Sequence, residues 1–160
     1  DTYNIQVEYF EGTGDAQIRF SWEPLTDNVW LGDYYTNSTL SGSPFISRLD
    51  TDINFDWDGN APLSIDDNED GINDFPSDNF SIRWFRLITV DAGTYRFTAQ
   101  ADDGVRVFVD SNLIINEWRD SQGDVTYEAT TQLSAGNHLI IVEYFENSGG
   151  ASVNVDFSRQ

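Results

Sequence analysis

The chain has 160 residues and a formal net charge of −20, with 28 acidic side chains against 8 basic ones, all of which are arginine. Such a polyanion repels phosphate backbones, so nucleic acid is not an expected ligand, and the absence of cysteine excludes disulfide scaffolds and zinc–thiolate sites. No apolar run approaches the ~20 residues of a membrane-spanning helix, whereas five Trp, seven Tyr and eleven Phe supply enough apolar surface for one folded core.

Apolar and polar residues alternate along most of the chain, a period typical of half-buried β-strands. In chain order the alternating runs occupy residues 3–9, 16–22, 95–101, 105–109 and 153–157. Turns rich in Gly, Asp and Asn separate these runs, and no window keeps a helical period. The pattern predicts an all-β fold, either a sandwich or a barrel.

One five-residue sequence occurs twice, because residues 7–11 and residues 142–146 both read Val-Glu-Tyr-Phe-Glu at an offset of 135. The similarity continues to residues 22 and 157, so residues 1–23 are predicted to form a β-hairpin that repeats the C-terminal hairpin of the domain. Residues 24–29 would be a linker and residues 30–158 the domain itself. The extra hairpin could end a preceding unit, dock on its own domain, or exchange between copies of the chain.

The stretch from residue 40 to residue 78 is rich in Gly, Pro, Asp and Asn and is predicted to be a long, acidic loop region with little regular structure. Five residues match the spacing of an EF-hand calcium loop: Asp66, Asn68, Asp70, Ile72 through its carbonyl, and Asp74. Ser77 stands where that loop needs Glu, and no helical pattern flanks it. The segment is therefore either a structural calcium loop or a solvated acidic loop.

Asp102 and Asp103 are followed by Gly104 between two alternating runs. Neighbouring side chains in a strand point to opposite faces, but a sharp turn or a cis peptide bond can direct both carboxylates to one side. Calcium prefers roughly six to eight hard oxygen ligands, and two close anions without a cation would repel each other. The alternative is an ordinary Asp-Asp-Gly turn that binds nothing.

Several motifs in order resemble the PA14 domain: the residues at 30–35, 80–84, 95–97, 102–106 and 140–144 read Trp-Leu-Gly-Asp-Tyr-Tyr, Phe-Ser-Ile-Arg-Trp, Tyr-Arg-Phe, Asp-Asp-Gly-Val-Arg and Ile-Ile-Val-Glu-Tyr. The resemblance implies an antiparallel β-sandwich. In lectin members, an Asp-Asp pair joined by a cis peptide and a second loop hold Ca²⁺, which binds glycan hydroxyls. That resemblance assigns Asp102, Asp103, Asn147 and Gly149 to the metal, and Asp102, Asp103 and Ser148 to the glycan.

Two functions follow as expectations. The first is a calcium-dependent carbohydrate-binding module, a lectin or adhesin of an extracellular or cell-surface protein, with a glycan or polysaccharide as partner. The second is a structural repeat of a surface array or filament, assembled with copies of itself through hairpin exchange, with calcium for stability. An enzyme is not expected, because carboxylate pairs are unspecific in a polyanion and the family's members are usually appended to catalytic domains.

Three further kinds of residue receive structural predictions. His138, the only histidine, is expected to be structural because the chain offers no second His or Cys to join it. Arg83 is expected to pair with a carboxylate on or under the sheet. Trp84 and Trp118 are expected to lie in the core.

Overall fold

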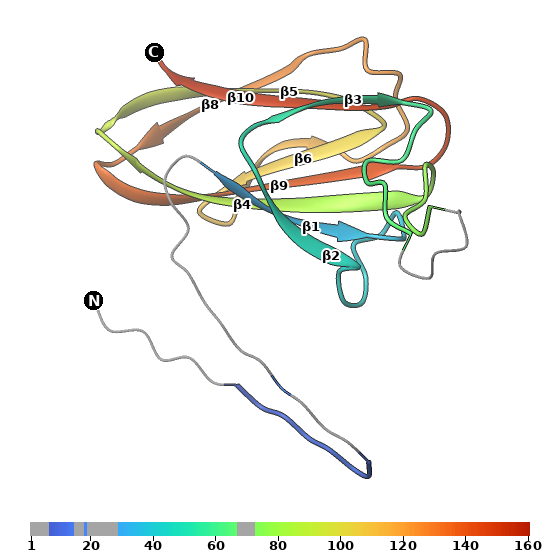
Figure 1. The fold of residues 1–160 in the computed structure, drawn as a ribbon. Coiled ribbons are helices and arrows are strands. Elements are labelled where there is room, and N and C mark those ends of the chain that lie inside the picture. Colours follow the sequence, from blue (N-terminus) through green and yellow to red (C-terminus); the bar gives the residue numbers. More distant parts are fainter. Residues whose placement is uncertain (1–6, 15–17, 19–28, 67–72) are drawn as a thin grey trace.

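The computed structural model describes residues 7–14, 18, 29–66 and 73–160, and over this part of the chain it forms two antiparallel sheets packed face to face (Figure 1). The larger sheet has the order β2-β1-β4-β9-β6-β7 and the smaller one the order β3-β10-β5-β8. The strands are β1 (Trp30–Tyr35), β2 (Ile46–Asp50), β3 (Ile53–Asp58), β4 (Phe80–Val90), β5 (Gly93–Asp102), β6 (Gly104–Val109), β7 (Asn112–Glu117), β8 (Tyr127–Leu133), β9 (Gly136–Glu146) and β10 (Ala151–Arg159). The predicted antiparallel β-sandwich is thereby confirmed.

Strands β4 and β9 form the centre of the larger sheet and pair over eleven residues, from Phe80 opposite Glu146 to Val90 opposite Gly136. Alternate residues of each strand point between the sheets, where they form one continuous apolar core. The largest side chains that are fully buried there are Trp84, Tyr34, Tyr144, Phe75, Phe80 and Phe97. The period-two pattern of the sequence therefore reports one buried face per strand, and Trp84 lies in the core as predicted.

The stretch from residue 40 to residue 78 differs from its prediction, because strands β2 and β3 both lie within it. Both are outermost strands of their sheets, and their burial is incomplete. A strand at an edge needs few apolar residues, since most of its side chains remain in water. The sequence of β2 therefore gave no clear alternation, whereas Ile53, Phe55 and Trp57 of β3 do alternate with polar residues and pack on the core. The expectation of little regular structure was wrong for this stretch.

Asp50, at the end of β2, is a buried carboxylate that joins three strands through hydrogen bonds. It accepts from the Tyr34 hydroxyl, from Trp84 Nε1 and from Arg48 Nε, each at 2.8 Å. Gly32 is required beside this group, because a Cβ atom there would come within 2.7 Å of Trp84 Nε1 and 2.8 Å of Asp50 Oδ2. The three hydrogen bonds compensate the cost of burying the Asp50 carboxylate. Without this carboxylate, the three donors would be left without an acceptor.

Arg83 on the outer face of β4 pairs with a carboxylate, as the sequence predicted. Its NH2 lies 2.7 Å from Oε1 of Glu143 on β9, and Arg106 of β6 approaches the other oxygen at 2.6 Å. Arg106 also stacks over the Trp118 ring at 3.9 Å, and this ring lies against Phe145. Trp118 therefore packs on the outer face of the larger sheet, and its predicted place in the core was wrong.

His138 on β9 is buried and is held between two hydrogen-bond acceptors. Its Nδ1 lies 2.5 Å from Asp110 Oδ2, and its Nε2 lies 3.0 Å from the Ser134 carbonyl oxygen. A neutral imidazole can donate from one nitrogen only, so this geometry fits the protonated ring. The hydrogen bond to Asp110, followed by that to Ser134, raises the pKa of His138 above its ordinary value, while burial opposes the rise.

We expect this pair to make stability depend on pH in one direction. The folded-state pKa is raised, so the contribution is fully present below the unfolded value of 6.5 and is lost as the pH rises through the folded value. The Tm of the wild type should fall by a few degrees across this window, relative to a His138→Gln variant followed by differential scanning calorimetry. A parallel pH profile for the two proteins would contradict the assignment.

The directions of the strands give the sandwich two distinct ends. β9 runs toward the end where β5 meets β6, and β10 runs back from it, so that Arg159 pairs with Tyr95 at the opposite end. β1 begins half-way along β4, with Leu31 opposite Phe85, and runs toward the end where β5 meets β6, with Tyr35 opposite Ser81. The loop between β9 and β10 (residues 147–150) therefore lies far from the C-terminus (Figure 1).

Residues 7–14 lie apart from the sandwich (Figure 1), and Phe10 is 89% exposed. Residues 1–6, 15–17 and 19–28 lie outside the described part, so the predicted hairpin (1–23) and linker (24–29) fall largely beyond it. The part of the chain that the structure describes contains no helix long and apolar enough to cross a membrane.

Candidate functional site

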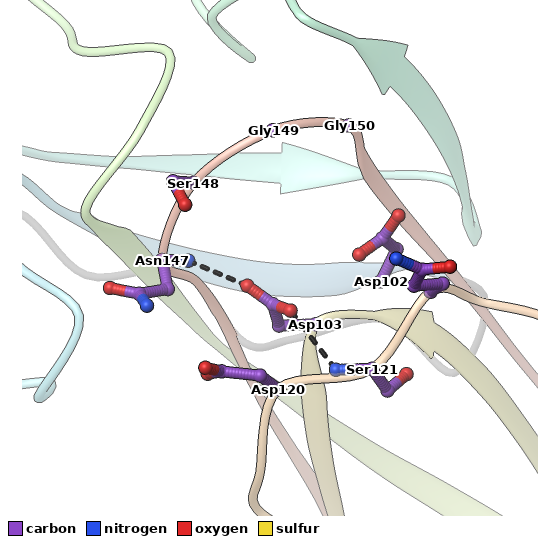
Figure 2. A pocket seen from close by; sticks show the side chains of 9 residues that line it. Asp102, Asp103, Asp120, Ser121, Asn147, Ser148, Gly149 and Gly150 are labelled. Atoms are coloured by element: carbon purple, nitrogen blue, oxygen red, sulfur yellow. Dashed lines mark hydrogen bonds between the residues drawn. The ribbon is translucent and has the colours of Figure 1, made fainter.

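The Asp102–Asp103 pair lies where β5 ends and β6 begins, at the end of the sandwich that also carries the β9–β10 loop. The peptide bond between the two aspartates is cis. Asp103 is buried, and its carboxylate accepts hydrogen bonds from the N–H of Asn147 at 2.9 Å and from the N–H of Ser121 at 3.0 Å. Two backbone segments that are distant in sequence are thereby attached to one side chain (Figure 2).

A third carboxylate, Glu146, completes the cluster. Oxygen atoms of Asp102, Asp103 and Glu146 all lie within 4.8 Å of one another, and Glu146 is fully buried. Its Oε2 is 3.4 Å from the Tyr144 hydroxyl, and its Oε1 has no hydrogen-bond partner. A buried carboxylate oxygen without a donor is costly, and the three carboxylates together could hold a cation that would satisfy it.

The pKa values in the cluster report the same crowding of negative charge. Burial, followed by the charges of Asp103 and Asp102, raises the pKa of Glu146 to about 8. Burial and then the charge of Asp103 raise the pKa of Asp102, and burial followed by the charge of Glu146 raises that of Tyr144. A divalent cation would remove the repulsion between the carboxylates, which adds to the effect of burial in these shifts.

The three carboxylates lie beside a pocket of about 590 Å³, which is lined by Asp102 and Asp103, by the β9–β10 loop and by residues 120–122. Ser148 and Asn147 lie across the pocket from Asp102 (Figure 2). The backbone carbonyl of Asn147 accepts from the N–H of Asn79 at 3.1 Å, and this hydrogen bond joins the β9–β10 loop to the start of β4.

The β9–β10 loop is fixed by a hydrogen bond to Asp78 and by the backbone conformation of Gly149. The N–H of Gly149 donates to Oδ1 of Asp78 at 2.9 Å, and the φ angle of Gly149 is +116°, a conformation that side chains disfavour. Asp78 ends the acidic stretch that precedes β4. The structure thus brings the predicted ligands Asp102, Asp103, Asn147 and Gly149, together with Ser148, to one pocket.

Two parts of the site were missed by reasoning from the sequence. Glu146 has the same strand parity as Val142 and Tyr144, so a core-facing carboxylate could have been recognised from the alternation of β9. Asp120, Ser121 and Gln122 carry no such signal. The connection between β7 and β8 brings them to the pocket, where the Ser121 hydroxyl donates to the Ala101 carbonyl at 2.6 Å.

The second predicted metal loop falls largely outside the described residues, which exclude Asn68, Asp70 and Ile72. Asp66 and Asp74 lie at its two ends. Between them, Asn73 joins the ends of the loop, because its side-chain oxygen accepts from the Ile65 N–H at 2.8 Å and its amide donates to the Leu63 carbonyl at 2.6 Å. Calcium binding by this loop stays a prediction.

Comparison with known proteins places these features in context. A family model described as the PA14 domain matches residues 26–160. Anti-sigma-I factor RsgI3 of Acetivibrio thermocellus is 33% identical over 131 residues, which cover 81% of this chain and 19% of that protein. The chain therefore spans about a fifth of this curated relative.

Two solved structures have the same arrangement of strands. An anti-sigma factor domain-containing protein superposes with a TM-score of 0.69 at 29% identity, and the match covers 82% of this chain and 43% of that one. The PA14 sugar-binding domain from an RTX adhesin superposes with a TM-score of 0.59 at 18% identity, with coverage of 84% and 92%. At that identity the second likeness concerns the fold alone.

Proposed function

The chain belongs to the PA14 domain family, and from this premise we propose that it is a calcium-dependent glycan-binding module. The observation that carries the proposal is Glu146, a fully buried residue whose Oε1 has no hydrogen-bond donor and whose carboxylate has an oxygen within 4.8 Å of oxygens of Asp102 and Asp103. The pocket beside this cluster is open and polar enough to admit a hydroxylated ligand.

The donor set fits calcium better than other common metals. Asp102, Asp103 and Glu146 offer hard carboxylate oxygens, and no cysteine exists in the sequence to favour zinc or copper. The side-chain oxygen of Asn147 and the carbonyl of Gly149 are further oxygens in the same pocket. Calcium accepts such irregular, oxygen-rich sets, whereas magnesium demands a near-ideal octahedron.

The glycan would bind at the open side of the same pocket. Calcium, when bound, supplies positive charge and coordination positions for vicinal sugar hydroxyls. Asp102 is only partly buried, so its carboxylate can also accept a hydrogen bond from a sugar hydroxyl, and Ser148 can donate or accept one across the pocket. The sugar-binding PA14 domain of the RTX adhesin supports this use of the fold.

Removal of calcium tests the proposal directly. At a calcium concentration 100-fold above Kd, binding would stabilise the folded state by about 2.7 kcal/mol, which raises the Tm by about 5–10 °C. We expect EDTA to abolish both this shift and glycan binding on a glycan array, and added calcium, but not magnesium, to restore them. Glycan binding that persists in EDTA would refute the proposal.

Similarity to anti-sigma-type proteins favours a regulatory setting for the module. We propose that in the full-length protein the module lies outside the cell and that glycan binding there controls the release of a sigma factor, in keeping with the 33% identity to Anti-sigma-I factor RsgI3. The full-length protein should then release its sigma factor when the glycan is added. An Asp102→Asn substitution should remove that response, and release that ignores the substitution would contradict this setting.

A further inference from the structure

Four apolar side chains near the N-terminus are uncovered, although their counterparts one repeat later are buried. Val7, Tyr9, Phe10 and Ile18 are 48%, 50%, 89% and 51% exposed, respectively. Their counterparts Val142, Tyr144, Phe145 and Val153 are exposed by 0%, 0%, 8% and 1%. Related residues are therefore buried in the sandwich in one place and exposed in the other.

The surroundings of the buried copy define what could cover the exposed one. β9, which holds Val142, Tyr144 and Phe145, lies between β4 and β6, and β10, which holds Val153, lies between β3 and β5. Both are interior strands, one in each sheet. A partner that covers this sequence on all sides must therefore supply strands to both sheets, which pairing at one exposed edge cannot do.

The sandwich of this chain has no vacancy of that kind, because its own β9 and β10 occupy both interior positions. A second intact copy would have the same two positions filled. The partner that fits is a sandwich of this fold that lacks its own last two strands.

We propose that residues 1–23 are the closing hairpin of a second PA14-type module, and that the strands of this module that correspond to β1–β8 precede Asp1 in the full-length protein. The exposed side chains of Val7, Tyr9 and Ile18 would then lie in the core of that upstream sandwich, and Phe10 would be covered on its outer face, as Phe145 is here. This assignment rests on the repeat of 135 residues and on the contrast in burial between its two copies.

The spacing of the two copies agrees with a tandem pair. Ser158, near the end of β10, corresponds to Glu23 at this offset, so residues 24–29 alone connect the upstream hairpin to Trp30. Such a connection spans at most about 20 Å, which places the two modules next to each other. The solved anti-sigma factor domain-containing chain, of which the match covers 43%, has room for two such domains.

The test compares the 160-residue chain with the natural protein extended upstream by one repeat length, 135 residues. Hydrogen exchange should find the amides of residues 7–11 unprotected in the 160-residue chain. In the extended protein the same amides should gain protection of at least ~1,000-fold, as for interior strands. Residues 7–11 that remain unprotected in the extended protein would overturn the proposal.

A matched pair of substitutions separates the two modules. Tyr144→Ala should lower the Tm of the 160-residue chain, whereas Tyr9→Ala should leave it unchanged. In the extended protein, Tyr9→Ala should lower the unfolding transition of the upstream module and leave the other transition in place. Loss of stability in the 160-residue chain on deletion of residues 1–23 would overturn the proposal in favour of docking on its own sandwich.

Light scattering addresses exchange between copies. The 160-residue chain and a chain that lacks residues 1–23 should both be monomeric at low micromolar concentration. Self-association that needs residues 1–23 and is abolished by Tyr9→Ala would show that a second copy is the partner, and would also overturn the proposal.

Discussion

Asp102→Asn is expected to weaken calcium binding by about 100-fold, equivalent to about 2.7 kcal/mol, and to abolish calcium-dependent glycan binding. The substitution removes one charged ligand from a cluster whose oxygen atoms lie within 4.8 Å of one another. It leaves in place the hydrogen bonds from Asn147 and Ser121 that fix the site, because both are made to Asp103. Isothermal titration calorimetry with calcium gives the affinity directly.

The same substitution has an opposite effect on the metal-free protein. The charges of Asp102 and Asp103 both raise the pKa of Glu146, so removal of one charge relieves repulsion when no cation is bound. In EDTA, the Tm of Asp102→Asn should therefore equal or exceed that of the wild type. A variant that lost calcium binding because it was misfolded would instead have a lower Tm.

Asp120→Asn is the matched control, since it removes one acidic charge from the lining of the same pocket but lies outside the three-carboxylate cluster. Its calcium affinity should stay close to that of the wild type. Equal losses in the two variants would indicate general attraction of calcium to a polyanion, and no defined site at Asp102.

Asp50→Ala is expected to destabilise the fold by about 3–5 kcal/mol, the range for loss of one partner of a buried ionic group. Three donors, from Tyr34, Trp84 and Arg48, would lose their common acceptor. At about 2–4 °C per kcal/mol, the Tm should fall by roughly 6–20 °C. Urea unfolding followed by tryptophan fluorescence measures the change in free energy.

Asp33→Ala serves as the control for this change. Asp33 lies on the outer face of β1 and accepts one hydrogen bond at the surface, from the Ser47 hydroxyl. Its removal should cost about 0.5–1.5 kcal/mol. If Asp50→Ala lowers the free energy of unfolding by no more than this, the buried hydrogen bonds of Asp50 contribute no more to stability than a surface hydrogen bond.

Strands with one buried apolar face were predictable from the sequence, whereas the mostly exposed edge strand β2 was not. β5, β6 and β10 show alternating apolar residues because one face of each is buried, whereas β2 lies at an edge, is mostly exposed and has no such alternation. The pairing of Arg83 with a carboxylate was also predictable, because a charged residue on a well-buried strand needs a partner.

The site was predictable only in its local parts. Asp102 and Asp103 are neighbours in sequence, and their loop partner Asn147 was indicated by the family resemblance. Glu146 could have been identified from strand parity, but Asp120 could not. Its position depends on how the chain crosses from the larger sheet at β7 to the smaller sheet at β8, which no local pattern encodes.

The directions in which β1 and β10 run have a consequence for multivalent recognition. β1 begins half-way along β4 and runs toward the β9–β10 loop, and β10 ends at the end of the sandwich that is remote from this loop, so a neighbour attached before β1 or after β10 leaves the pocket sterically accessible. Modules joined in this way could engage one long polymer at several positions at once. Their combined avidity would then exceed the affinity of any single pocket, without a new contact in any of them.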